Sequence, residues 1–202
     1  MPTPAQIFFL LFIMLGPFKI LGPLAKLTRG AAPALIRTIV IRAVLLATII
    51  LLLAAVIGDN MLANFGIPLP VLALAAGVIL FLVALLNVLS QFEPPDLSAA
   101  PVTPPSPNVA MHPLAFPTIV TPYGIAAVIV FMGLSPDIQG KLMVAYIVLA
   151  IMAINLIFML LNRFIFKPLS IILPLLGAIL GLVQVALGIK IMFNALKTML
   201  ES

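Results

Sequence analysis

Cysteine and tryptophan are both missing from this chain of 202 residues, and histidine occurs once, at His112. Without cysteine, neither a disulfide framework nor a thiolate metal site is available. Charge is scarce as well: charged residues make up 7% of the chain and hydrophobic residues 64%, whereas about a quarter of the residues of a soluble domain are charged. These scarcities exclude water as the main solvent of the fold, and we expect no metal site and no cofactor.

The sequence also lacks the residue sets that an enzyme would need within a membrane. Hydrolysis or group transfer there requires paired carboxylates, a metal cluster or an activated nucleophile near a base. The acids all lie in connections between apolar runs or at the terminus: Asp59, Glu93, Asp96, Asp137 and Glu201. No Walker-type glycine-rich loop is present, which excludes ATP hydrolysis by this chain. We therefore expect that the protein is not an enzyme, and His112 stays open as an interfacial or a proton-linked residue.

Apolar runs are what the sequence has in abundance, and each is close to the length of about 20 residues that a helix needs to cross a bilayer. Six such runs follow one another: Gln6–Leu24, Thr38–Ile57, Ile67–Leu89, Pro113–Gly133, Leu142–Leu161 and Ser170–Phe193. None of them has an acid in its middle. The pattern predicts an all-α, polytopic membrane protein with about six transmembrane helices, whose main partner is the lipid bilayer.

Basic residues give the chain a formal net charge of +5, but they are scattered beside the apolar runs. Such scattering is typical of topology signals, so we expect no binding of nucleic acid. The larger group lies in the connections after the first and fifth runs: Lys26, Arg29, Arg37, Arg163 and Lys167. Because an excess of Lys and Arg marks the cytoplasmic side, we expect a multi-pass protein of the cell membrane with both termini outside. In a Gram-negative bacterium this would be the inner membrane.

The connection from Phe92 to His112 is rich in proline: Pro94, Pro95, Pro101, Pro104, Pro105 and Pro107. Proline fixes φ and has no backbone donor, so we expect an extended segment that cannot hold a helix. We interpret residues 92–112 as a linker between two three-helix parts, residues 1–91 and 113–202. A docking segment for a proline-binding partner is the alternative interpretation.

Helix-breaking signals recur at a fixed offset in the two parts. Gly16-Pro17-Phe18 matches Thr121-Pro122-Tyr123 at an offset of 105 residues, and Pro70 matches Pro174 at an offset of 104. Each part has three spans, an odd number, so the second part must enter the membrane from the opposite side. The sequence therefore predicts two inverted three-helix repeats, the arrangement in which many transporters form a binding site from broken helices.

A proline inside a span removes one backbone hydrogen bond, which is tolerated where the break is buried in protein or lines a wet cavity. We expect breaks at Pro17 and Pro122 that face one another near the middle of the membrane. Beside them, Gly16, Thr121 and Gly124 would let backbone amides approach a ligand closely. Simple kinks that help helices to pack are the alternative.

Three polar side chains in the spans have two interpretations each. Lys19 either adds a cation to the same cavity or snorkels along its aliphatic stem to the cytoplasmic interface. Asn87 and Gln184 continue stripes of small residues, which by themselves indicate close helix packing. A carboxamide is costly in lipid unless it is paired, so both should point into the bundle, where they hydrogen-bond a neighbour or line a solute path.

Three segments carry a family resemblance: LGPFKILGPLAKLT at residues 15–28, FGIPLPVLALAAGVILFLVAL at residues 65–85 and HPLAFPTIVTPYGIAAVI at residues 112–129. With these segments the chain resembles the MarC-related membrane proteins, a family that includes the SnatA small neutral amino acid transporters and is grouped with LysE-like exporters. The resemblance implies a six-helix membrane protein and amino acid transport. The chain departs from the family pattern at Gly16, where Asp or Asn is usual, at Lys19, where a small residue is usual, and at Thr121-Pro122-Tyr123, where Gly-Pro-Gly is usual.

These observations favour a secondary carrier or exporter of a small solute, with a small neutral amino acid as the favoured substrate. The alternative is a non-transporting membrane scaffold or regulatory protein of the same family. The candidate substrate-binding residues are Gly16, Pro17, Lys19, Asn87, Thr121, Pro122, Gly124 and Gln184. A coupling ion and a homo-oligomer both stay open.

Overall fold

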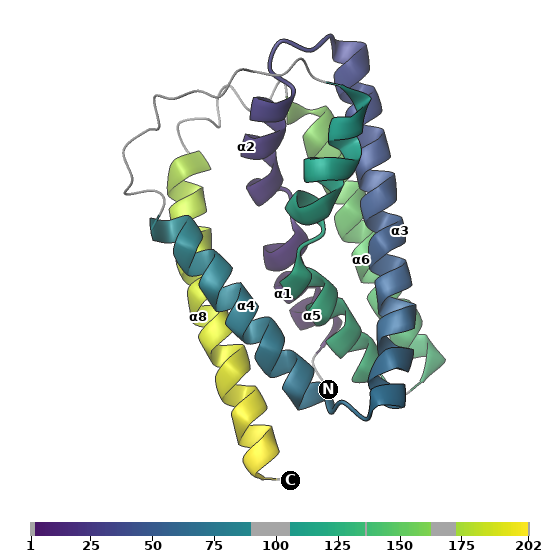
Figure 1. Cartoon of the computed structure of the whole chain (residues 1–202), viewed down its shortest axis with the longest axis vertical. Coiled ribbons are helices and arrows are strands. Elements are labelled where there is room, and N and C mark those ends of the chain that lie inside the picture. The colour runs from purple at the N-terminus through teal and green to yellow at the C-terminus, as the bar shows by residue number, and fades with distance from the viewer. Residues whose placement is uncertain (1–2, 90–105, 136, 163–172, 202) are drawn as a thin grey trace.

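The computed structural model describes residues 3–89, 106–135, 137–162 and 173–201, with only the backbone described for Asn87 and a few other helical residues. Every regular element in these ranges is a helix, which confirms the predicted all-α class (Figure 1). The elements are α1 (Pro4–Leu15), α2 (Phe18–Leu27), α3 (Pro33–Phe65), α4 (Leu69–Leu89), η1 (Pro107–Ala110), η2 (Met111–Ile119), α5 (Pro122–Gly133), α6 (Ile138–Leu160) and α8 (Leu173–Leu200).

The prediction of about six spans is confirmed. Five stretches are long and apolar enough to cross a membrane: Pro4–Leu27, Pro33–Gly58, Leu69–Leu86, Ile138–Leu160 and Gly177–Leu200. The pair Pro107–Ile119 and Pro122–Gly133, bent by 61°, supplies the sixth if it is one span. Helix α3 has 33 residues and is therefore about 50 Å long, more than a hydrocarbon core of about 30 Å requires.

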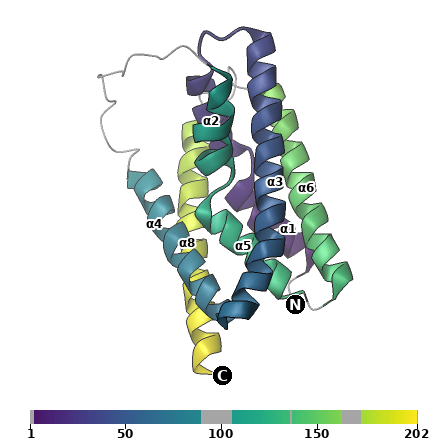
Figure 2. The same cartoon turned by 45° about the vertical axis from the view of Figure 1, so that its right-hand side comes forward.

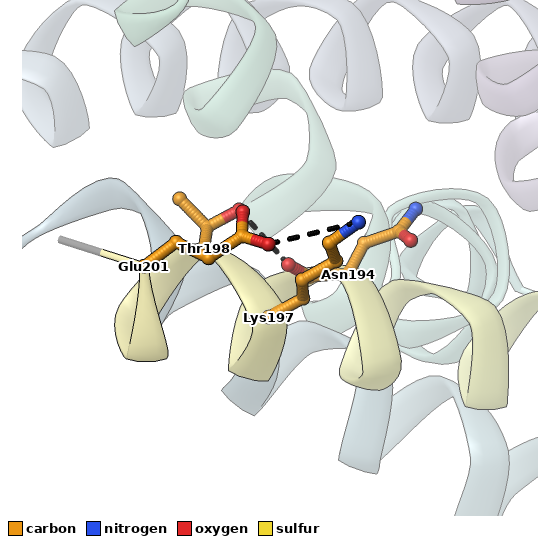
Figure 3. A network of polar contacts seen from close by, with 4 residues as sticks. All are labelled: Asn194, Lys197, Thr198 and Glu201. Carbon is orange, nitrogen blue, oxygen red and sulfur yellow. Dashed lines mark hydrogen bonds and ion pairs between the residues drawn. The ribbon is translucent and has the colours of Figure 1, made fainter.

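The helix that contains the predicted last span is longer than expected. Helix α8 continues past Phe193 to Leu200, and its last turns are polar (Figure 3). There Lys197 Nζ lies 3.7 Å from Glu201 Oε1, and both side chains are more than half exposed, so the pair adds at most about 0.5 kcal/mol to the stability.

The C-terminal part of the predicted linker is helical and not extended. Pro107–Ala110 is a short 3-10 helix, because proline is accepted in the first turn of a helix.

Helices from the two predicted parts of the chain pack against one another. Helix α4 packs along α8, α3 packs against α6, and α1 and α2 lie in the centre against α5 and η2 (Figures 1 and 2). Both termini lie at the same end of the bundle (Figure 1). The inverted relation of the two parts, and the division at residues 92–112, stay predictions.

Close backbone contact joins α4 to α8. A Cβ atom added at Gly188 would lie 3.0 Å from the carbonyl oxygen of Gly77, and one added at Gly77 would lie 3.1 Å from the carbonyl oxygen of Gly188. Gly181 meets the side chain of Val88. The predicted stripes of small residues are Ala73, Gly77 and Ala84 on α4 and Gly177, Gly181 and Gly188 on α8. Close packing is confirmed at Gly77, Gly181 and Gly188, whereas a Cβ added at Gly177 would have no atom within 4 Å.

The bundle is apolar both inside and outside. Leu11, Leu15, Ile20, Leu24 and Ile151 are fully buried between the central helices and their neighbours. Large apolar side chains also cover the outer surfaces of α3, α4 and α8, among them Leu45, Leu53, Leu82, Leu86 and Leu182. Soluble monomers rarely expose such extensive apolar patches, so the surface fits a bilayer. The buried polar side chains include Thr121, Asn155 and Gln184.

Candidate solute site at two interrupted spans

The first break is Gly16-Pro17, where α1 ends and α2 begins. Gly16 is extended, with φ −71° and ψ 173°, and its N–H donates to the carbonyl of Phe12 at 2.8 Å. In a continuous helix the N–H groups of residues 17, 18 and 19 would donate to the carbonyls of residues 13, 14 and 15. Proline has no N–H and the change of direction removes the other two bonds, so three carbonyls at the end of α1 lose their usual donors.

Side chains from three different helices take the place of those donors. Gln184 Nε2 on α8 donates to Ile13 O at 2.9 Å, Lys19 Nζ on α2 donates to Met14 O, and Asn155 Nδ2 on α6 donates to Leu15 O at 2.8 Å. Each freed carbonyl thus receives one donor. Unsatisfied carbonyls cost several kcal/mol in a membrane interior, so these three side chains make the first break tolerable.

The second break is Val120-Thr121, between η2 and α5. Both residues are extended, and the axes of the flanking helices differ by 61°. Thr121 is the N-cap of α5: its Oγ1 accepts a hydrogen bond from Gly124 N at 3.2 Å. Pro122 follows at the first helical position, where its missing N–H costs nothing. The cap and the proline therefore reduce the number of unsatisfied N–H groups in the first turn of α5.

The two breaks contact each other. Lys19 Nζ, which already donates to the end of α1, lies 3.4 Å from the carbonyl oxygen of Ile119 at the end of η2. The same ammonium lies 5.5 Å from the ring centroid of Tyr123. Across the contact, the side chain of Leu15 packs on Gly124, where an added Cβ would come within 2.5 Å of Leu15 Cδ2. The predicted meeting of spans 1 and 4 at their breaks is present.

The detailed orientation differs from the sequence-based expectation. Pro17 is buried, but Pro122 is exposed, so the two rings do not face one another across the interior. Gly16 and Gly124 were expected to let backbone amides approach a ligand closely, and their own amides already donate to Phe12 O and Thr121 Oγ1. Thr121 caps α5 with its own hydroxyl, which takes up the Gly124 amide.

The predictions for the three polar residues in the spans differ in how they compare with the structure. Gln184 is buried and hydrogen-bonds a neighbouring helix, as expected of a carboxamide in lipid. The snorkelling interpretation of Lys19 is wrong, because its ammonium is directed at two interior backbone carbonyls. Asn87 belongs to α4, but its side chain lies outside the described residues.

Asn155 also contacts the first break, although it was not among the candidate residues predicted from the sequence. Its side chain is fully buried, and its Oδ1 has no hydrogen-bond partner among the described residues. The signal was present in the sequence: a carboxamide in the middle of an apolar run carries the same cost as Asn87 and Gln184. Asn155 places an acceptor beside the first break.

Met14, two residues before the first break, lines a cavity of about 430 Å³. It lies between α1, α4, α5 and α8, and its lining includes Pro70, Ala73, Phe131, Asn194 and Thr198. Apolar side chains form most of the wall, whereas Asn194 and Thr198 belong to the polar end of α8 (Figure 3). Within the part of the chain that the structure describes, no cluster of His, Cys, Asp and Glu could hold a metal ion.

Comparison with known proteins gives one consistent result. The family model described as MarC family integral membrane protein matches residues 2–200. A UPF0056 membrane protein of Aquifex aeolicus is 25% identical over 197 residues, which are 96% of this chain and 92% of the relative. Two UPF0056 membrane proteins of Methanocaldococcus jannaschii are 26% and 25% identical, over 93% and 92% of this chain and 92% and 83% of their own lengths. No solved structure gives a significant match.

Proposed function

The chain belongs to the MarC family of integral membrane proteins, and from this premise we propose that it is a carrier or exporter of a small solute, most favourably a small neutral amino acid. One observation carries the proposal: two interrupted spans, far apart in the sequence, contact each other inside the bundle through Lys19 and Ile119. Transporters commonly bind solutes where broken helices meet near the middle of the membrane.

The cost of the arrangement supports a functional role. Lys19, Asn155 and Gln184 are polar groups within mostly apolar spans, and each donates to a carbonyl that the interruption of span 1 leaves without its usual donor. A continuous helix with apolar side chains at these positions would avoid every one of these groups. Ionisable and polar residues inside membranes are expensive and typically mark solute or ion paths.

The groups around the first break suit a zwitterion with a small apolar side chain. At the start of α2, the backbone N–H groups of Phe18 and Lys19 have no acceptor among the described residues, and a helix N-terminus favours a carboxylate. Asn155 Oδ1 is an acceptor for an ammonium group. The apolar cavity of about 430 Å³ that Met14 lines is in the size range of small-molecule sites.

The test is solute flux in proteoliposomes, with a panel of radiolabelled amino acids and Asn155→Ala as the decisive variant. We expect the wild type to move small neutral amino acids faster than protein-free liposomes do, and Asn155→Ala to slow this flux at least about tenfold, since it loses a hydrogen bond to a buried partner. Asn162→Ala is the matched control, because Asn162 is a second buried asparagine with an unpartnered Oδ1 and lies just beyond the C-terminal end of α6.

Absence of flux for every solute of the panel, in either direction and with or without ion gradients, would contradict the proposal. It would favour the scaffold or regulatory role instead. Equal flux in Asn155→Ala and wild type would leave a carrier but would remove the first break as its site.

A further inference from the structure

The ammonium of Lys19 lies between three groups that all carry partial negative charge. It donates to Met14 O at the C-terminal end of α1, lies 3.4 Å from Ile119 O at the C-terminal end of η2, and lies 5.5 Å from the ring centroid of Tyr123. The C-terminus of a helix carries roughly half a negative elementary charge, and an aromatic face attracts cations. The geometry is that of a cation-binding position.

The ammonium of Lys19 donates to backbone carbonyls and pairs with no carboxylate of the described residues. The five acids of the sequence all lie outside the apolar runs. Backbone carbonyls at the ends of half-helices are the groups with which transporters coordinate alkali cations within the membrane. Lys19 therefore has the surroundings of a bound alkali cation, not those of a partner in a salt bridge.

A positive charge at this position also stabilises the backbone around it. The terminal carbonyls of α1 and the carbonyl of Ile119, which lies three residues after the non-helical Phe116 of η2, meet here. In a medium of low dielectric constant the partial negative charges of these carbonyl oxygens repel each other. A cation between them turns that repulsion into attraction to a common centre. We infer that the meeting point of α1 and η2 is a monovalent cation site, which the chain fills with the tethered ammonium of Lys19 and which would accept Na⁺ once that side chain is removed.

One consequence concerns coupling and rests on the proposed function. With the position already filled by the chain's own ammonium, solute movement needs no Na⁺ at this point. Wild-type flux should then be equal in NaCl and in choline chloride of the same concentration. The cation site itself does not depend on transport and is tested by stability.

The experiment compares the melting temperatures of purified wild type, Lys19→Ala and Lys19→Met in NaCl, KCl and choline chloride at constant ionic strength. Lys19→Ala removes the ammonium and leaves space for an ion. Lys19→Met removes the charge but fills nearly the same volume. We expect Na⁺ at about 100 times its Kd to raise the melting temperature of Lys19→Ala by about 5 °C or more, with no shift in Lys19→Met or in the wild type.

Equal melting temperatures of Lys19→Ala in NaCl, KCl and choline chloride would overturn the inference. If Lys19→Ala cannot be recovered folded in any salt, the decision passes to Lys19→Arg and Lys19→Met. A folded, wild-type-like Lys19→Arg together with a destabilised Lys19→Met supports a required cation, whereas a Lys19→Met as stable as wild type overturns it. Because melting reports no transport, a failure of the proposed carrier function would appear in the flux assay alone.

Discussion

Replacing Gln184 by leucine tests how the first break is stabilised. Gln184 is 8% exposed, and its Nε2 donates to Ile13 O at 2.9 Å. Pro17 has no N–H, so no backbone donor can take over this carbonyl. Leucine has a similar volume, which leaves the unsatisfied carbonyl as the main effect, and a buried acceptor without a donor costs about 1–3 kcal/mol. For a chain of this size that corresponds to a fall of roughly 2–12 °C in the melting temperature.

A second substitution makes this prediction more specific. Pro17→Ala restores an N–H at residue 17, which can donate to Ile13 O if the span becomes continuous. We expect the double variant Gln184→Leu, Pro17→Ala to regain most of the lost stability and to lose solute flux, because the straightened span no longer has a break. Stability and function would then change in opposite directions, which a nonspecific packing defect would not produce.

The assay is thermal unfolding followed by far-ultraviolet circular dichroism, because a chain without cysteine or tryptophan gives no signal with thiol-reactive dyes and no tryptophan fluorescence. Gln139→Leu makes the same change at an exposed position of α6 and should leave the melting temperature within about 1 °C. An unchanged melting temperature in Gln184→Leu would refute the argument that side chains replace the missing backbone donors.

Three further predictions follow from the packing and the topology. Gly16→Ala should destabilise the chain by more than about 2 kcal/mol, measured by thermal unfolding, because the added Cβ would lie 2.2 Å from a backbone carbonyl oxygen of the preceding turn. Gly188→Leu should cost about 1–3 kcal/mol by separating α4 from α8, whereas Gly177→Leu, with nothing within 4 Å, should be close to neutral in the same assay. Single cysteines at Ser98 and Ser202 should be labelled by an impermeant thiol reagent from opposite sides of the membrane, the first from the cytoplasm, and labelling from one side would refute the expected topology.

The sequence was sufficient to predict the features that depend on local chemistry. Apolar runs of bilayer length predicted the spans, and Pro17 predicted the first break, because proline cannot supply the donor that a continuous helix needs. Gln184 was predicted to point inward since a carboxamide in lipid needs a partner. Each of these inferences uses one residue and its solvent, and no knowledge of which helices are neighbours.

Features that depend on which helices meet could not be predicted from the sequence. Pro122 was expected to face Pro17 in the interior, but it is exposed, because the helices that pack around this position leave it uncovered. The direction of Lys19 required knowing that the end of η2 lies beside the end of α1. Asn155 became visible as part of the site only when α6 was seen to pack on the first break.

Solute protection at the first break is the most direct test of the central claim that the two breaks form the solute site. Asn155→Cys introduces the only cysteine of the chain at the residue that donates to Leu15 O. Asn162→Cys, just beyond the C-terminal end of α6, is its control. The rate of labelling by a small thiol reagent is measured with and without a saturating amino acid that the wild type moves. The account predicts that the solute slows labelling of Asn155→Cys several-fold and leaves Asn162→Cys unchanged, and an unchanged rate at Asn155→Cys would contradict it.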